Sequence, residues 1–116
     1  MIYLASPYTH QDDAIRLFRF NEVCRAASIL MLDGKHVFSP IAYTHPIAQY
    51  GIPLGWEFWE SFDRFYIGVC DELLVLMLDG WRESKGVQAE IGIAKELQKP
   101  VTYCTPLLLR QCTRGA

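Results

Sequence analysis

The stretch DELLVLMLDGWRESKGVQAEIGIAKELQKP, from Asp71 to Pro100, determines the architecture we expect for the whole chain. It begins with an unbroken apolar run from Leu73 to Leu78, with acidic residues on both sides. Such a run, without alternation, is typical of a strand covered on both faces of a parallel sheet. The loop that follows leads to Ser84, which predicts a helix N-cap. We expect this helix to end near Gln98, because a proline follows two residues later.

Glu90 occupies a position in this helix where a carboxylate is not expected. At about 100° per residue, the helix from Val87 to Gln98 has one apolar arc, and Glu90 falls inside it between Leu97 and Ala94. Carboxylates are almost never fully buried without a partner. The pattern therefore indicates that Glu90 either pairs with a cation on a neighbouring element or lines a cleft.

The order of strand, loop and helix favours a cleft. In an open parallel sheet, ligands bind outside the carboxyl ends of the strands, and the loop from Asp79 to Gly86 lies at such an end. Asp79 would stand at the strand terminus, with Glu90 on the first turns of the following helix. Two acids beside one cleft suggest nucleophilic or acid/base chemistry. Spacing alone leaves an ion pair between Glu90 and a nearby Arg or Lys equally open.

The first third of the chain predicts a β-α-β unit. Ile2 to Ala5 reads as a buried strand, Asp12 or Asp13 caps the next helix, Gly34 ends it, and Lys35 to Ser39 forms a second strand. The crossover should be right-handed and the two strands parallel. The expected core-facing stripe of this helix consists of Leu17, Phe20, Cys24, Ala27 and Met31.

The middle of the chain is harder to interpret. The three prolines between Ser39 and Pro53 indicate a long loop, and such loops are usually functional or interfacial. Leu54 to Val69 predicts a helix with aromatic side chains on two faces, one for the sheet and one for a second subunit or the roof of the cleft. Its polar remainder is Glu57, Glu60, Asp63 and Arg64. Val101 to Cys104 is the last expected strand, and the apolar residues after it look uncapped, with a loose end at 110–116.

Together these elements predict a single domain spanning residues 1–116, with a three-layer α/β sandwich and a mostly parallel, flavodoxin/Rossmann-like sheet of four to five strands. The net charge of −2 and the lack of a basic patch argue against a nucleic-acid polymer as partner. No segment approaches the ~20 apolar residues of a membrane span, and no leader is apparent. The four widely spaced cysteines suggest reduced thiols and a cytoplasmic location.

Sequence motifs suggest neither a cofactor nor a metal. The first strand is not followed by G-x-G-x-x-G, the chain has no P-loop, and no Cys or His pair has zinc-ligand spacing. The carboxyl edge of the sheet should instead gather side chains for a small molecule. Tyr8, in the turn Ser6-Pro7-Tyr8, would either stack on a planar ring or pack against the next loop. His45 would be an acid/base group or a polar surface residue. Asp79 and Gly80 would also suit a simple turn.

Three sequence motifs resemble the nucleoside 2-deoxyribosyltransferase superfamily, and most closely a small uncharacterised bacterial branch of it. They are I-Y-L-A-S-P-Y at residues 2–8, C-D-E-L-L-V-L-x-L-D-G-W at 70–81, and S-x-G-V-x-x-E-I-x-x-A-x-x-x-x-K-P-V at 84–101. The resemblance implies transfer of a deoxyribosyl group to another base, or its hydrolysis from a nucleoside or nucleoside monophosphate, through a covalent glycosyl-enzyme intermediate.

Residue by residue, the resemblance implies that Glu90 is the nucleophile, that Asp79 binds the sugar or protonates the base, and that Tyr8 contributes to the pocket. The helix dipole would keep Glu90 ionised. Arg82, Lys85 or the helix start at Ser84 and Gly86 would hold a 5′-phosphate. A non-catalytic module that binds a nucleotide or an ADP-ribose-like ligand is the alternative. We also expect a homo-oligomer, dimer or higher, because the aromatic helix leaves much apolar surface to cover.

Overall fold

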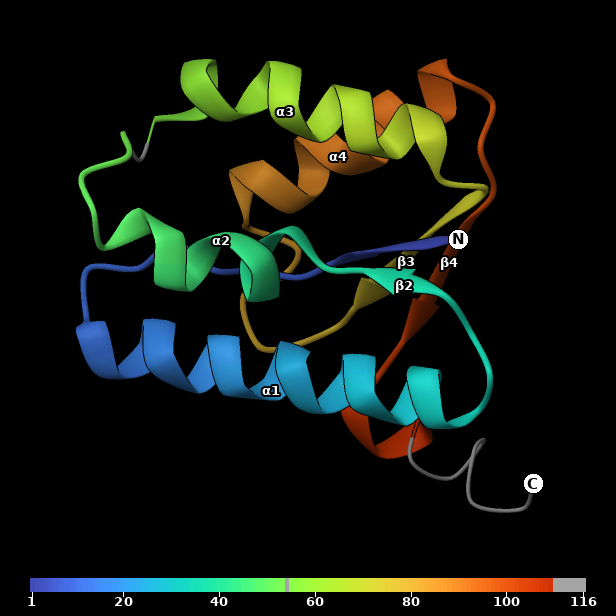
Figure 1. Cartoon of the computed structure of the whole chain (residues 1–116), viewed down its shortest axis with the longest axis horizontal. Coiled ribbons are helices and arrows are strands. Elements are labelled where there is room, and N and C mark those ends of the chain that lie inside the picture. The colour runs from blue at the N-terminus through green and yellow to red at the C-terminus, as the bar shows by residue number, and fades with distance from the viewer. Residues whose placement is uncertain (54, 110–116) are drawn as a thin grey trace.

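The computed structural model describes residues 1–53 and 55–109, in which strands and helices form one α/β domain (Figure 1). The strands are β1 (Ile2–Ala5), β2 (Val37–Phe38), β3 (Glu72–Leu76) and β4 (Val101–Cys104). The helices are α1 (Asp13–Leu32), α2 (Pro40–Ala48), α3 (Trp56–Val69) and α4 (Lys85–Glu96). None of the helices in these two ranges is long and apolar enough to cross a membrane.

The strands form one parallel sheet in the order β2-β1-β3-β4, so the expected α/β sandwich is confirmed. The central strand β1 pairs with both neighbours, with Tyr3 opposite Phe38 on one side and Leu73 on the other. The chain leaves β1 toward β2 and leaves β3 toward β4, which makes the gap between the carboxyl ends of β1 and β3 a topological switch point. Ligands bind at such points in open α/β sheets.

Helices cover both faces of the sheet, because the strand side chains alternate between them. Leu4 and Leu76 face α1, where they join the apolar cluster that contains Val23 and Leu30. Tyr3 belongs to the opposite cluster, which α3 and α4 complete with Ile67, Val87 and Ile91. Figure 1 shows the sheet between these two helical layers. The layer of α3 and α4 therefore receives every strand side chain that shares the face of Tyr3.

The predicted core stripe of α1 is wrong in all but one position. The buried residues of α1 are Val23, Ala26, Ala27 and Leu30. Leu17 and Met31 are 52% and 55% exposed. Apolar side chains occur around the whole circumference of this helix, so their spacing did not identify the buried face. The predicted N-cap is confirmed, since the Asp12 carboxylate accepts from the backbone N–H of Ala14 at 2.8 Å.

The expected long loop from Ser39 to Pro53 is also wrong, because most of it is the helix α2. Ser39 is the N-cap, and its hydroxyl accepts from the backbone N–H of Ala42 at 3.1 Å. Pro40 fits the first helical position, where its missing N–H has no partner to lose. The prolines that suggested a loop therefore start this helix and, at Pro46, lie inside it.

The remaining boundaries differ from the predictions by a few residues. β3 begins at Glu72, one residue earlier than predicted, and ends at Leu76, two residues earlier than predicted. β2 is shorter than predicted. The residues after β4 are capped, because Thr105 Oγ1 accepts from the backbone N–H of Leu108 at 3.0 Å. The predicted loose end at 110–116 and the predicted helix start at position 54 lie outside the described residues.

Candidate active site

Ser84 places Glu90 in the layer between the sheet and α3. The Ser84 hydroxyl accepts a hydrogen bond from the backbone N–H of Val87 at 3.2 Å, which confirms the predicted N-cap of α4. From that start, Val87, Ile91 and Ala94 face the core, and Glu90 lies on the same buried face. Glu90 is 6% exposed, so the expectation of a carboxyl group inside the apolar arc is confirmed.

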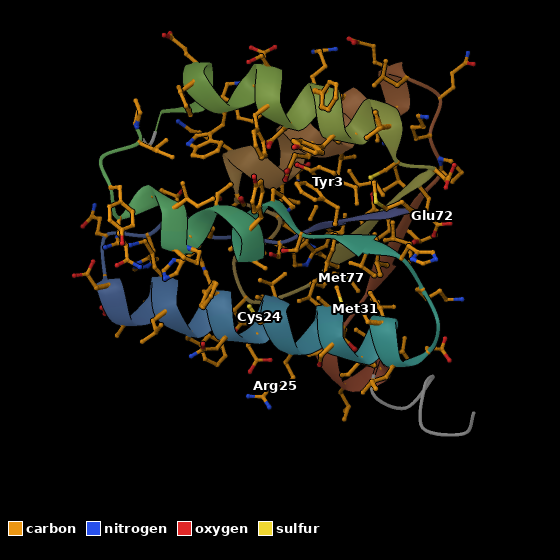
Figure 2. All side chains as sticks on the ribbon, viewed as in Figure 1. Tyr3, Cys24, Arg25, Met31, Glu72 and Met77 are labelled. Atoms are coloured by element: carbon orange, nitrogen blue, oxygen red, sulfur yellow. The ribbon has the colours of Figure 1, made fainter. Side chains whose placement is uncertain are left out.

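The surroundings of Glu90 differ from both alternatives that the sequence suggested, which were an ion pair with a cation and a place beside a cleft. No cation of the described chain pairs with it. Instead, the Tyr3 hydroxyl donates a hydrogen bond to Glu90 Oε2 at 2.5 Å, and the carboxyl group of Asp63 on α3 is close enough to raise the pKa of Glu90. Figure 2 shows Tyr3 extending from the sheet toward α3 and α4. The buried triad consists of Tyr3, Asp63 and Glu90, one residue from each of β1, α3 and α4.

The position of Asp63 differs from the prediction, which placed this residue with the polar remainder of its helix. It is only 7% exposed and shares the buried side of α3 with Ile67. Its position four residues before Ile67 is the signal that sequence reasoning missed, because residues four apart share a helix face. Tyr3 carried a weaker signal, in that a tyrosine on a fully covered strand needs a hydrogen-bond partner for its hydroxyl.

The triad holds one more proton than two ordinary carboxylates would. Burial raises the pKa of Glu90 well above its usual range, and the negative charge of Asp63 adds to this effect. Burial also raises the pKa of Asp63 to about 6, although hydrogen bonds with Tyr3 and Glu90 act in the opposite direction. Burial and both acids raise the pKa of Tyr3, which stays a donor. These shifts favour a pair that holds one proton near neutral pH, more tightly on Glu90 than on Asp63.

The expectation that the helix dipole keeps Glu90 ionised is therefore wrong. The dipole acts mainly within the first turn of a helix, and Glu90 is beyond the first turn of α4, which begins at Lys85. Desolvation is the larger effect at this depth.

The shared proton makes stability depend on pH. We expect the free energy of unfolding to fall as pH rises from about 4 to 7. The folded pKa of Asp63, about 6, exceeds its ordinary value of 3.8. Its stabilising contribution is therefore complete below the unfolded pKa and is lost as pH rises through the folded pKa. For Asp63 this loss is about 3 kcal/mol.

Urea titrations between pH 4 and 8 measure this loss. The free energy of unfolding of the double variant Asp63→Asn/Glu90→Gln should be nearly independent of pH over this range, after the contributions of the other titratable groups are subtracted. The variant Glu57→Gln, at an exposed position of the same helix, should behave like the wild type. A wild-type stability that rises over this range would contradict the charge assignment.

Of the other predicted site residues, Ser6, Pro7 and Tyr8 lie on the loop after β1, and His45 lies in α2. Tyr8 and His45 are brought together, with 2.6 Å between the Tyr8 hydroxyl and His45 Nδ1, and His45 also stacks on Phe20. Ser6 is buried, and its hydroxyl has no partner among the described residues, while Pro7 beside it is fully buried.

The predicted residues after β3 contact other groups than Glu90. The backbone carbonyl of Asp79 accepts from Arg19, and Asp79 is not among the described groups that interact with Glu90. The Arg82 guanidinium lies 5.3 Å from the ring centre of Trp81. Gly86 is in the first turn of α4.

An aromatic cluster adjoins the triad on the side of β2. Phe38 stacks on Tyr66 with 4.2 Å between ring centres and lies 5.8 Å from the ring of Tyr3. Phe62 and Tyr43 extend the cluster toward α2. Phe62 and Tyr66 also line a hollow on the outer side of α3, and Glu90 is not among the residues that line it. In the described chain, no group of three or more His, Cys, Asp or Glu side chains is arranged to hold a metal.

Fold and site together define a small parallel α/β domain whose interior carries a proton-sharing pair of acids held by a tyrosine. The chain belongs to the family described as Domain of unknown function (DUF1937), whose model matches residues 1–105. That match covers β1 to β4 and all three members of the triad. No curated protein matches the chain.

Proposed function

We propose that the domain cleaves or transfers the N-glycosidic bond of a nucleoside or nucleoside monophosphate, with Glu90 as nucleophile. The observation that carries the proposal is the pair Glu90 and Asp63, which shares one proton beside the Tyr3 hydroxyl. Cleavage of such a bond needs one carboxylate and one carboxylic acid at the same centre. The pair supplies both in its singly protonated state.

The reaction begins with a proton transfer from Glu90 to Asp63 within the pair. As the proton of Glu90 moves to Asp63, Glu90 becomes a carboxylate, and its oxygen forms a bond to the anomeric carbon of the sugar. The bond from that carbon to the base nitrogen breaks, the electron pair goes to the base, and Asp63 delivers the proton to it. Asp63, now a carboxylate, then takes a proton from water or from an acceptor base, whose oxygen or nitrogen forms a bond to the anomeric carbon as the bond from Glu90 to that carbon breaks. The Tyr3 hydroxyl orients Glu90 through its 2.5 Å hydrogen bond.

In this proposal Asp63 replaces Asp79 as the acid partner of Glu90. The support is the effect of Asp63 on the pKa of Glu90 and the joint burial of the two side chains. Asp79 keeps a place on the rim of the sheet, as do Tyr8, His45 and Arg82. These rim residues would contact the base or the phosphate, and the start of α4 at Ser84 and Gly86 offers backbone N–H groups to an anion.

The direct test is to incubate the protein with a panel of nucleosides and nucleoside 5′-monophosphates and to measure free base by chromatography. A second incubation with an added acceptor base separates transfer from hydrolysis. Release of base from at least one member supports the proposal. If no member releases base while one of them still raises the melting temperature, the catalytic reading fails.

One observation favours the alternative of a non-catalytic nucleotide-binding or ADP-ribose-binding module. Glu90 retains only 6% exposure, and a substrate must displace neighbouring side chains to reach it. In a binding module, the triad would serve only to hold α3 and α4 on the sheet. Glu90→Gln would then leave ligand binding unchanged, and no base would be released by either form.

We also propose that copies of the chain associate through the outer face of α3. Phe58, Phe65 and Val69 are 48%, 62% and 52% exposed there, and Phe58 and Phe65 line the hollow that contains Phe62. Exposed apolar area of this kind commonly marks an interface. Light scattering over a dilution series should report a dimer or larger species, and Phe65→Asp should shift it toward the monomer.

A further inference from the structure

Arg19 connects the two loops that border the switch point of the sheet. It lies on the second turn of α1, and its Nη1 donates to the backbone carbonyl of Thr9 at 3.1 Å. Its Nη2 donates to the backbone carbonyl of Asp79 at 3.2 Å. Thr9 belongs to the loop after β1, and Asp79 belongs to the loop after β3. One guanidinium therefore spans the gap where an open α/β sheet binds its ligand.

The loop after β3 is shaped to receive this guanidinium. The backbone N–H of Trp81 bonds to the carbonyl of Leu78 at 3.0 Å, which closes a turn with Gly80 at φ +92°. A Cβ atom at Gly80 would lie 2.7 Å from Arg19 Nη2. Gly80 suits this turn because the turn needs a positive φ, and a side chain at this position would push the end of Arg19 away from the loop.

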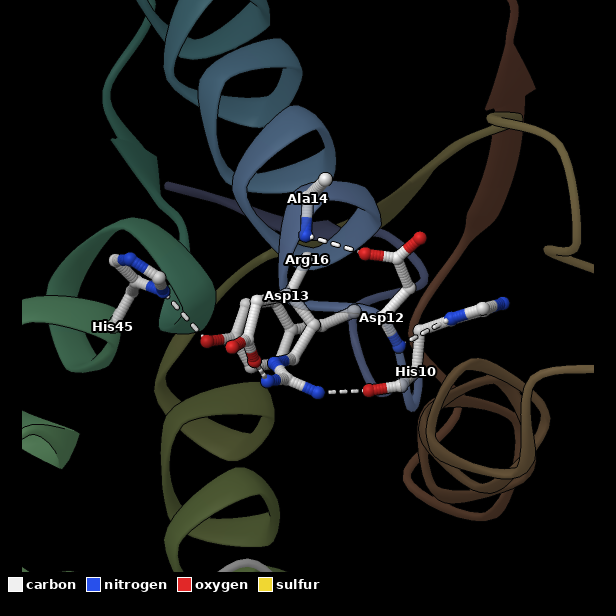
Figure 3. Close-up of polar contacts among 7 residues, drawn as sticks. His10, Asp12, Asp13, Ala14, Arg16 and His45 are labelled. Carbon is white, nitrogen blue, oxygen red and sulfur yellow. Dashed lines mark hydrogen bonds and ion pairs between the residues drawn. The ribbon is translucent and has the colours of Figure 1, made fainter.

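The loop after β1 is held at three successive residues. Tyr8 bonds to His45 of α2, Thr9 to Arg19, and His10 through its carbonyl to Arg16, the last of which is drawn in Figure 3. Loops are usually the mobile part of a domain, and this one is tied to two helices. Of these three contacts, only that of Arg19 extends to the loop after β3 in the described part of the chain.

We propose that Arg19 is a positioning residue that fixes the distance between the loops 6–12 and 77–84, and so sets the width of the switch point at which the proposed substrate would bind. The role depends on the planar fork of the guanidinium, whose nitrogens donate in two directions at once. A lysine ammonium keeps the charge but has no such fork. The link to substrate rests on the proposed function, whereas the link between the two loops does not.

Hydrogen exchange measured by mass spectrometry on the whole chain tests the link between the loops. Arg19→Gln and Arg19→Lys should both increase exchange about 10-fold or more in peptides from 6–12 and from 77–84, because each charged hydrogen bond is worth about 1.5–3 kcal/mol. Arg16→Gln should increase exchange in 6–12 alone. Arg25→Gln, at an exposed position of the same helix, should change neither loop. A rise confined to one loop in the Arg19 variants overturns the proposal.

Kinetics on a substrate found in the nucleotide panel test the effect on the switch point. Arg19→Gln should raise KM by roughly 10-fold with kcat within about twofold of wild type, as expected when a group that shapes binding is lost. Millimolar guanidinium, but not ammonium, should restore KM in Arg19→Ala. An unchanged KM, or equal rescue by ammonium, contradicts the positioning role. If the wild type releases no base, the proposed function fails, and the exchange experiment still decides on Arg19.

Discussion

Replacement of Glu90 by glutamine should lower kcat/KM for base release on the order of 10⁴-fold, the scale seen when the nucleophile of a catalytic unit is removed. The fold should survive, because glutamine reproduces the neutral form that Glu90 adopts when buried. Its carbonyl oxygen accepts from the Tyr3 hydroxyl, and its amide N–H donates to Asp63. The amide cannot bond to the anomeric carbon and be displaced again, so only the chemical step is lost.

A matched control comes from the same helix. Glu96 is exposed at the end of α4 and pairs with Arg64 of α3. Glu96→Gln makes the same chemical change as Glu90→Gln, from a carboxyl group to an amide, and should leave kcat/KM unchanged. The assignment of Glu90 is refuted if Glu90→Gln retains base release while its circular dichroism and melting curve match those of the wild type.

Replacement of Asp63 by asparagine should lower kcat by about 10²–10⁴-fold, the usual contribution of a general acid. The wild-type rate should fall below about pH 6, because the pKa of Asp63, raised to about 6, marks the loss of the last negative charge of the pair. Below that pH both acids are neutral, and neither can attack the sugar. At high pH the rate should fall again when both are ionised, since the base then has no proton donor. The acidic limb near pH 6 should disappear in Asp63→Asn.

The two roles separate on a substrate that needs no proton for departure. At a pH high enough to ionise Glu90 without Asp63, an aryl deoxyriboside with a nitrophenolate leaving group should be cleaved by Asp63→Asn at close to the wild-type rate, whereas Glu90→Gln should remain inactive. Equal loss in both variants on this substrate would show that Asp63 does not act as the acid. Asp79→Asn is the comparison that distinguishes the two candidate acids, and we expect it to leave the pH profile unchanged.

The elements that the sequence predicted best are those with one strong local signal. The apolar runs of β1 and β4 and the Ser84 cap of α4 are each determined by neighbours in the sequence, and all three are confirmed. The helix α2 was missed because proline both starts helices and breaks them, and the sequence does not say which applies at Pro40. The buried face of α1 depends on where the sheet lies, which its own spacing does not reveal.

The candidate site was predicted only in part, for a related reason. Glu90 was recognisable because its position in an apolar arc is a local property. Its partners come from distant segments, since Tyr3 is 87 residues away in the sequence. The charge of Glu90 depends on those partners and on burial, so helix position alone gave the wrong ionisation. Asp63 carried the same local signal as Glu90, but three other charged residues on its helix concealed it.

The most direct test of the central claim is to trap the sugar on the enzyme. A nucleotide from the panel is prepared with fluorine at the 2-position of its sugar, which slows the release step, and the protein is digested and analysed by mass spectrometry. The account predicts one sugar per chain, attached to Glu90 in the peptide that follows Ser84, with one equivalent of base released. Base release at a steady rate with no sugar on Glu90, or with the sugar on another residue, would contradict it.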